Sequence, residues 1–215
     1  MKKLILSIAA LAFSVGAFAQ GQPLGFGVKA GVNFPKYNYS GSNSTIETSS
    51  ATSFHVTAFL DAPLVGNYLY VQPGVSLQGK GAKFAEGTAF GNDISVTQNT
   101  MWVEVPVNLV AKLPTGLAGQ VFVGAGPYVG FGLSGKNKVS GGNGNSDEFG
   151  DFKFGNDEDL KGTDFGLNFI AGYQLGSGLM IHGGYGLGLT NLTPDGGGNL
   201  KTTNRVWTVG LGFAL

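Results

Sequence analysis

Residues 101–133, MWVEVPVNLVAKLPTGLAGQVFVGAGPYVGFGL, form two runs of alternating residues that are joined by a short turn. In the first run every second residue is apolar, and the residues between them include Glu104 and Lys112. Because side chains along a strand point alternately to its two faces, one face is wholly apolar and the other carries both charges. The second run, from Val121 to Leu133, repeats the pattern, and the proline and glycines before it suit a turn. This stretch predicts a β-hairpin of a membrane barrel.

The same alternation recurs in six further runs along the chain, and within the strand interiors the apolar face of each run carries no charge. The predicted strands cover residues 25–34, 53–61, 68–80, 101–112, 121–133, 164–175, 179–192 and 205–215. About 9–11 residues of tilted strand cross a bilayer, and a basic residue facing lipid at mid-depth costs about 2–4 kcal/mol. The pattern therefore predicts an all-β fold, an eight-stranded antiparallel up-and-down transmembrane β-barrel of the outer-membrane type. Apolar side chains would face lipid and the polar face would line the lumen.

The predicted connections alternate between long and short. Those at about 35–52, 81–99, 134–163 and 193–204 are long and rich in Gly, Ser, Asn and Thr, whereas those at 62–67, 113–119 and 176–178 are tight. Outer-membrane barrels have short periplasmic turns and longer external loops, which places both termini on the periplasmic side.

Three prolines, Pro73, Pro106 and Pro127, fall inside predicted strands. Each removes a backbone donor from the hydrogen-bond ladder. We expect bulges or locally broken pairing at these positions.

The first nineteen residues have the features of a cleaved signal peptide. Lys2 and Lys3 form a positive segment, an apolar run too short to span a bilayer follows, and Ala17-Phe18-Ala19 is a small-x-small pattern before a cleavage site. The prediction is a signal peptide at residues 1–19 and a mature barrel domain at residues 20–215.

Composition excludes several classes of function. The chain has no cysteine, so thiolate chemistry, disulfides and lipid modification at an N-terminal cysteine are absent. Its 13 basic and 13 acidic residues balance, and loss of Lys2 and Lys3 with the signal peptide leaves a net charge of −2. The mature chain therefore lacks the excess of positive charge that is typical of nucleic-acid-binding proteins. The 38 glycines exceed ordinary usage without the repeat of collagen.

Four motifs resemble those of a known barrel family. They are EVPVNL at 104–109 followed by Lys112, GAGPYVG at 124–130, DFGLN at 164–168 and GLTNL at 188–192. With them, the mature chain resembles the small porin-like, PorT-type outer membrane β-barrel family. The resemblance implies an eight-stranded barrel in the cell outer membrane, with no catalytic residues to carry over, and a role as an accessory to protein secretion is one implied possibility.

The end of the chain departs from that family. Leu215 stands where such barrels commonly have an aromatic residue, but Phe213 keeps the apolar face. Outer-membrane lipid and the barrel assembly machinery, which would recognise the C-terminal strand, are the expected partners.

The polar face predicts a filled lumen, because eight strands enclose little more than their own side chains. On this face, long side chains occur mostly in the first half of the chain and glycines mostly in the second half. The strands of the second half would therefore form a wall of glycines that leaves room for long side chains from the opposite wall. A narrow wet pore for ions or small solutes is the alternative. The candidate polar network consists of Lys29, Gln72, Glu104, Asn108 and Lys112. Lys29 and Glu104 are candidates for a buried ion pair.

The two histidines discourage a metal or catalytic interpretation. Counting positions along the strands places His55 near the external end of its strand and His182 near the periplasmic end of another. A site needs convergent ligands, and no hydrolase or phosphate-binding motif is present. We expect no enzyme activity, no cofactor and no metal.

The connection at 134–163 contains six acidic residues beside three phenylalanines. Divalent cation binding is conceivable, but the spacing of Asp157, Glu158 and Asp159 is not that of a calcium loop, and a solvated acidic loop is favoured. The neighbouring aromatic residues leave open an extracellular ligand at the long loops. The predicted function is therefore that of a monomeric barrel with a structural or loop-mediated binding role.

Overall fold

The structure is a computed structural model that describes residues 24–41, 45–89, 92–116, 118–140, 146–155, 158–195 and 200–215. The predicted signal peptide lies outside these residues. The strands are β1 (Gly25–Ser40), β2 (Thr45–Glu47), β3 (Ser53–Val65), β4 (Leu69–Ala89), β5 (Asn92–Pro114), β6 (Gly119–Ser140), β7 (Ser146–Phe152), β8 (Thr163–Leu175), β9 (Leu179–Gly188) and β10 (Lys201–Ala214). In the described part of the chain, no helix is long and apolar enough to cross a membrane.

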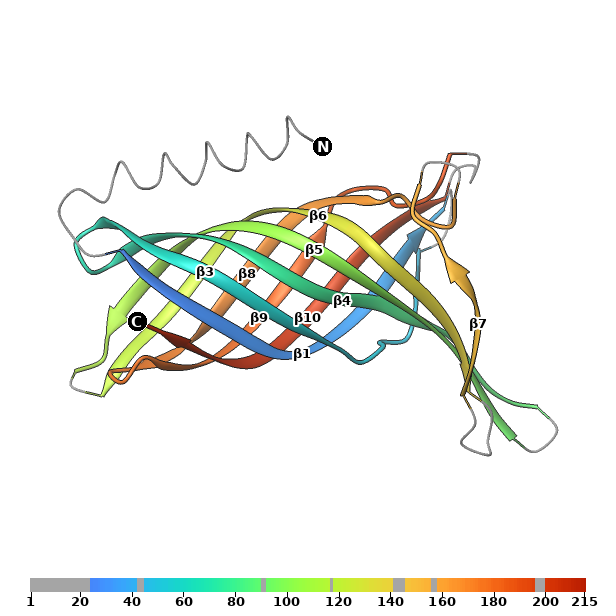
Figure 1. The fold of residues 1–215 in the computed structure, drawn as a ribbon, viewed down its shortest axis with the longest axis horizontal. Coiled ribbons are helices and arrows are strands. Elements are labelled where there is room, and N and C mark those ends of the chain that lie inside the picture. Colours follow the sequence, from blue (N-terminus) through green and yellow to red (C-terminus); the bar gives the residue numbers. More distant parts are fainter. Residues whose placement is uncertain are drawn as a thin grey trace.

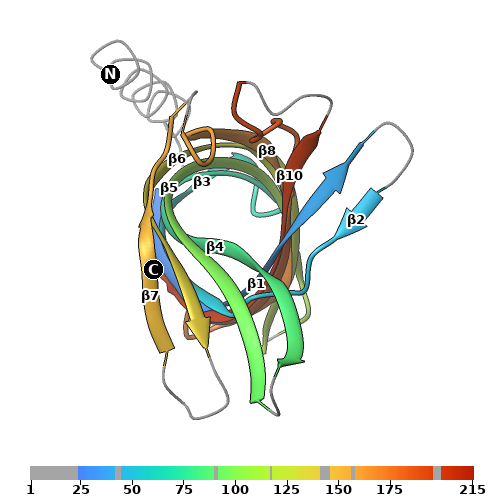
Figure 2. The ribbon, with the colours of Figure 1, turned by 90° about the vertical axis from the view of Figure 1, so that its right-hand side faces the viewer.

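Eight of these strands close into a barrel (Figures 1 and 2). Their order is β1, β3, β4, β5, β6, β8, β9 and β10, and β10 pairs with β1 to complete the ring. Every pairing between named strands is antiparallel, and each barrel strand lies next to its neighbours in sequence, as in an up-and-down barrel. Short β2 pairs with β1 and β7 pairs with β6, both at the end of the barrel that has the long connections. The predicted fold class is confirmed.

The apolar face points outward, as predicted. Val28, Val56, Val123 and Val209 are each about half exposed, whereas the chain neighbours of Val28 and Val56 are buried inside the barrel. The buried set includes the polar side chains of β1, β3, β4, β5, β8 and β9. This arrangement is the inverse of a water-soluble barrel, since apolar groups cover the outside and charged groups lie within.

Several strands are longer than predicted. Residues 81–99, expected to be a loop, belong mostly to a hairpin in which β4 runs to Ala89 and β5 begins at Asn92. Strands β1 and β6 also continue past their predicted ends, whereas β9 ends at Gly188 rather than at residue 192. The prediction failed there because it relied on apolar alternation, which marks contact with lipid. The backbone ladder continues beyond the lipid, where polar residues such as Thr are equally compatible with a strand.

The strand prolines interrupt pairing without shifting its register. Between β4 and β5, Pro73 pairs with Val107 and the next pair given is Ser76 with Glu104, which keeps the same register. Pro106 has the same effect between β5 and β6. Broken pairing was therefore predicted correctly, but the register shifts lie elsewhere. They fall between Pro63 and Val65, between Lys83 and Ala85, and between Met101 and Trp102.

Candidate functional site

The lumen is the candidate site, and its side chains form layers from the short-turn end to the long-connection end. One apolar cluster lies near the short turns. It consists of the buried residues Phe59, Val110, Phe122, Met180 and Ala214, with Tyr70 and Ile170 packed against it. These residues lie near the ends of their strands at the short turns, so this cluster, which we call the inner apolar layer, lies at that end of the barrel.

An ion pair lies beside the inner apolar layer. Lys112 of β5 is paired with Asp61 of β3, and both side chains are buried. Gln72 donates a hydrogen bond of 3.0 Å from Nε2 to Asp61 Oδ1, and the Lys112 ammonium lies 4.2 Å from the ring centre of Tyr70. The Asp61 carboxylate thus has two partners, as a buried charge requires.

A second charged cluster lies nearer the long connections. Lys80 Nζ is 2.5 Å from Glu104 Oε1 and 2.8 Å from Asp164 Oδ2. Tyr128 Oη and Asn204 Nδ2 donate to the same Asp164 oxygen, at 3.0 and 3.1 Å. One lysine therefore joins two buried carboxylates from β5 and β8, which we call the Lys80 cluster.

This geometry corrects the ion pair expected from the sequence. Glu104 is paired with Lys80 and not with Lys29. The Lys29 ammonium instead lies 4.4 Å from the ring centre of Phe59. The sequence places Lys29, Lys80 and Glu104 on the same lumenal face, but only the register and stagger of the closed barrel decide which lysine reaches the glutamate.

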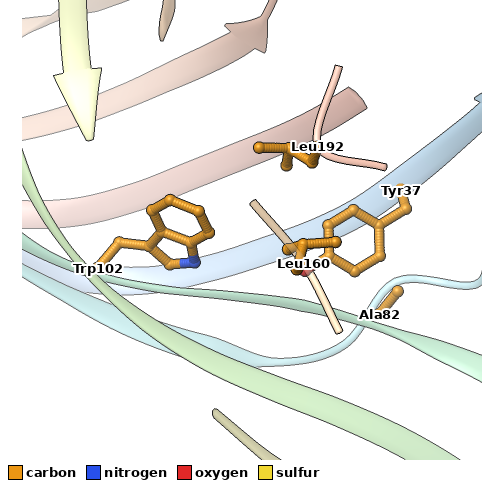
Figure 3. Packing of buried hydrophobic residues seen from close by; sticks show 5 residues of the cluster. All are labelled: Tyr37, Ala82, Trp102, Leu160 and Leu192. Carbon is orange, nitrogen blue, oxygen red and sulfur yellow. The ribbon is translucent and has the colours of Figure 1, made fainter. Parts of the chain in front are cut away.

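A second apolar layer lies at the long-connection end of the lumen. It consists of Tyr37, Ala82, Trp102, Leu160 and Leu192, all buried, with Tyr39 and Phe154 packed against it. Their side chains converge from β1, β4, β5 and two connections (Figure 3). Trp102 packs edge-on against Phe154 with ring centres 5.0 Å apart. This outer apolar layer closes the other end of the barrel.

A cavity of about 70 Å³, lined by both polar and apolar side chains, lies between the two apolar layers. Its lining includes Lys29, His55, Asn108 and His182 together with Lys80 and Glu104. A buried water needs about 10–15 Å³ of such space, so the cavity has room for several. Within the described residues, no group of three or more His, Asp or Glu side chains is arranged to hold a metal ion.

The histidines meet inside this cavity, contrary to the sequence prediction that they lie far apart. Their ring centres are 5.3 Å apart. His55 pairs with Gly31, Gly31 with Gly210, and Gly210 with His182, so all four residues lie in one row across β3, β1, β10 and β9. The prediction counted positions from strand ends and omitted the stagger that closing a barrel imposes. A Cβ added to Gly210 would lie 2.8 Å from His182 Nε2, so this glycine leaves space for that ring.

Lumenal glycines do make room for large side chains, but these come from the adjacent strand rather than the opposite wall. A Cβ added to Gly172 would lie 2.5 Å from Phe122 Cζ, and one added to Gly166 would lie 2.6 Å from Tyr128 Cε1. In each case the two residues are direct partners across β6 and β8. The large ring therefore occupies the space that a side chain on its glycine partner would fill. Such aromatic–glycine pairs across neighbouring strands also help to fix the strand register.

We expect Gly172→Ala to destabilise the barrel by about 1–3 kcal/mol, the usual cost of overpacking. The added methyl would collide with the Phe122 ring and with a backbone carbonyl of β9, which cannot rotate aside. The free energy of unfolding, measured by urea titration of the refolded protein in phospholipid vesicles, tests this.

Gly183→Ala in β9 is the matched control, because its added Cβ would meet only Thr208 O at 3.6 Å. It should unfold within about 0.5 kcal/mol of the wild type, as a change free of collisions does. Equal losses in the two variants would show that glycine itself, and not the packed ring, sets the stability.

The five residues of the predicted polar network are all buried, and they fall in three places. Gln72 and Lys112 belong to the ion pair with Asp61, Glu104 belongs to the Lys80 cluster, and Lys29 and Asn108 line the cavity. The Oδ1 atom of Asn108 has no hydrogen-bond partner.

The sequence interpretation missed Asp61, Lys80 and Asp164 as network members, although each is a charged residue on or beside the polar face of a predicted strand. The balance of charge inside the barrel could have identified these residues from the sequence. An interior with three lysines needs acidic partners, and these are the acids whose strand positions point inward.

Residues 18–193 match the sequence model of a family described as "Outer membrane protein beta-barrel domain". Among solved structures, the chain is similar to outer membrane protein OprG of Pseudomonas aeruginosa, with 12% identity, a TM-score of 0.44, and coverage of 89% of this chain and 95% of that one. It is also similar to Neisserial surface protein A, with 14% identity, a TM-score of 0.42, and coverage of 90% and 99%.

A further similar structure is Ail, the attachment invasion locus protein of Yersinia pestis, with 14% identity, a TM-score of 0.40, and coverage of 88% of this chain and 98% of that one. A comparison with curated proteins finds no match. The family match spans most of the chain and agrees with the closed barrel and its apolar exterior. This chain is therefore an integral protein of the cell outer membrane and belongs to the outer membrane protein β-barrel domain family.

Proposed function

We propose that the protein is a sealed, non-enzymatic barrel that acts through its external surface, in a structural or binding role. The observation that carries this proposal is the pair of apolar layers. Phe59 and Phe122 belong to the inner layer, and Trp102 and Leu192 belong to the outer layer. Because ions cross apolar constrictions poorly, layers at both ends of the lumen oppose conduction.

The external end supports a binding role. Tyr37, Tyr39 and Phe84 form an aromatic group with ring centres 6.2–6.3 Å apart, and Phe84 is 45% exposed. The β4–β5 hairpin and the β6–β7 pair project past the ring at the same end (Figures 1 and 2). Tyr37 is buried in the outer apolar layer and packs against Phe84, whose exposed ring is the kind of side chain found at binding surfaces. We propose that an extracellular ligand binds there.

We expect the refolded wild-type protein to give no steady single-channel current in a planar bilayer. A shift in gel mobility on boiling, recorded on the same sample, would establish that the barrel is folded. A variant with both Phe59→Ala and Phe122→Ala should show more current, because it removes two large rings from the inner apolar layer.

Steady current from the folded wild type, scaling with the amount of inserted protein, would overturn the sealed barrel. It would favour the second candidate function, a narrow channel for ions or small solutes. The cavity between the apolar layers, with charged side chains in its lining, is the observation that favours this alternative.

Three expectations about export, assembly and secretion, and one about oligomeric state, belong to this proposal. We propose that residues 1–19 are removed after export, on the basis of the small-x-small pattern before Gln20. We propose that the assembly machinery recognises β10, whose Phe213 side chain faces outward. A PorT-type role in protein secretion is supported only by the motif resemblance and is the least specific of the three. The barrel is proposed to act as a monomer.

A further inference from the structure

We propose that the lumenal cavity binds one small monovalent anion, such as chloride, beside Lys29. The proposal goes beyond the proposed function, and it holds whether or not the barrel conducts. Three observations carry it: a buried lysine without a carboxylate partner, a buried histidine nitrogen without a partner, and a cavity that joins them.

The first observation is the charge balance of the lumen. Lys112 is neutralised by Asp61, and Lys80 is shared between Glu104 and Asp164. Of these three lumenal lysines, only Lys29 has no carboxylate within 4.0 Å in the described part of the chain. Lys29 is nevertheless 8% exposed. A buried ammonium without a nearby negative charge is costly, so an anion beside it would be stabilised.

The second observation concerns hydrogen-bonding groups that also line the cavity. His182 is 6% exposed, and its Nε2 atom has no partner. That nitrogen carries a hydrogen in one neutral tautomer and in the charged ring, so it can donate to an anion. Asn108 and Thr208 line the same space, and their amide and hydroxyl groups can also donate.

The cavity selects for size and sign of charge. Its volume of about 70 Å³ fits a halide, which is little larger than water. A metal ion would find two histidines, His55 and His182, beside the Lys29 ammonium, and the Glu104 carboxylate in the same lining is already paired with Lys80. The nearby positive charge therefore favours an anion over a cation.

Bromide is a suitable probe, because its anomalous scattering locates it directly. Crystals of the wild-type barrel that has been refolded in sodium bromide, so that the ion is present before the barrel closes, should show a peak in the cavity near Lys29. In solution, bromide should raise the urea midpoint of unfolding relative to gluconate, a larger anion, at equal ionic strength.

Lys29→Met keeps the length of the side chain and removes its charge, so it should abolish the peak and weaken the bromide effect at least tenfold. Lys201→Met, at an exposed lysine, is the matched control and should leave both unchanged. If Lys29→Met does not fold, His182→Leu replaces it, with the same expectation of at least a tenfold loss.

A cavity that holds water only, or bromide that binds only at the outer surface, would overturn the proposal. So would a bromide peak that persists in the Lys29→Met or His182→Leu variant. Loss of the peak in the tested variant, together with its retention in Lys201→Met, would establish the site.

Discussion

Replacement of Lys80 by methionine is expected to lower the free energy of unfolding by about 3–5 kcal/mol, which is the cost of breaking a buried ion pair by removing one partner. Methionine fills similar space, so the loss would come from charge and not from a cavity. It would leave Glu104 and Asp164 buried together without a cation. Urea titration of the barrel in phospholipid vesicles, followed by tryptophan fluorescence, measures this change.

The triple variant Lys80→Met, Glu104→Gln, Asp164→Asn serves as the control for that experiment. It removes the uncompensated carboxylates and should recover much of the lost stability, because neutral groups cost less to bury. Lys201→Met, at an exposed lysine, should change little. If Lys80→Met were as stable as the wild type, the Lys80 cluster would not be a stabilising element of the lumen.

Replacement of Val209 by arginine is expected to cost about 2–4 kcal/mol, because it places a charge against lipid near the middle of β10. Val209 is 53% exposed on the apolar exterior, with Val32 as its partner in β1. Reduced folding yield in vesicles and a lower urea midpoint would report the loss.

Two variants test whether depth in the bilayer causes this effect. Val209→Leu keeps the site apolar and should be near neutral. Val65→Arg places the same charge at the short-turn end of β3, where about 0–1 kcal/mol is expected near the interface. Equal costs at positions 65 and 209 would contradict the assignment of the exterior to lipid.

The sequence predicted the barrel because one physical requirement acts on every strand. Lipid contact demands apolar side chains at alternate positions, and runs such as 101–112 display that demand directly. The same logic did not extend to residues 81–99, where the β4–β5 hairpin continues in water and no lipid shapes the sequence.

Within the candidate site, the sequence determined which face each polar residue occupies. Lys29, Gln72, Glu104, Asn108 and Lys112 are all buried inside, as the period of two requires. The alternation of side chains along a strand does not predict which residues these side chains contact. The choice of partner depends on which residues of distant strands lie at the same position along the barrel axis. That position is set by the stagger of the strands in the closed barrel.

The histidines show most clearly which features follow from the sequence and which depend on the tertiary structure. The sequence alone determined a polar lumenal face, an apolar exterior and the order of the strands, because these follow from local alternation and short connections. Only the tertiary structure decided that His55 and His182 share one row across two glycines, that Lys80 binds both Glu104 and Asp164, and that Lys29 is left beside a cavity. Those contacts join residues far apart in the chain, and their geometry exists only once β10 has closed on β1.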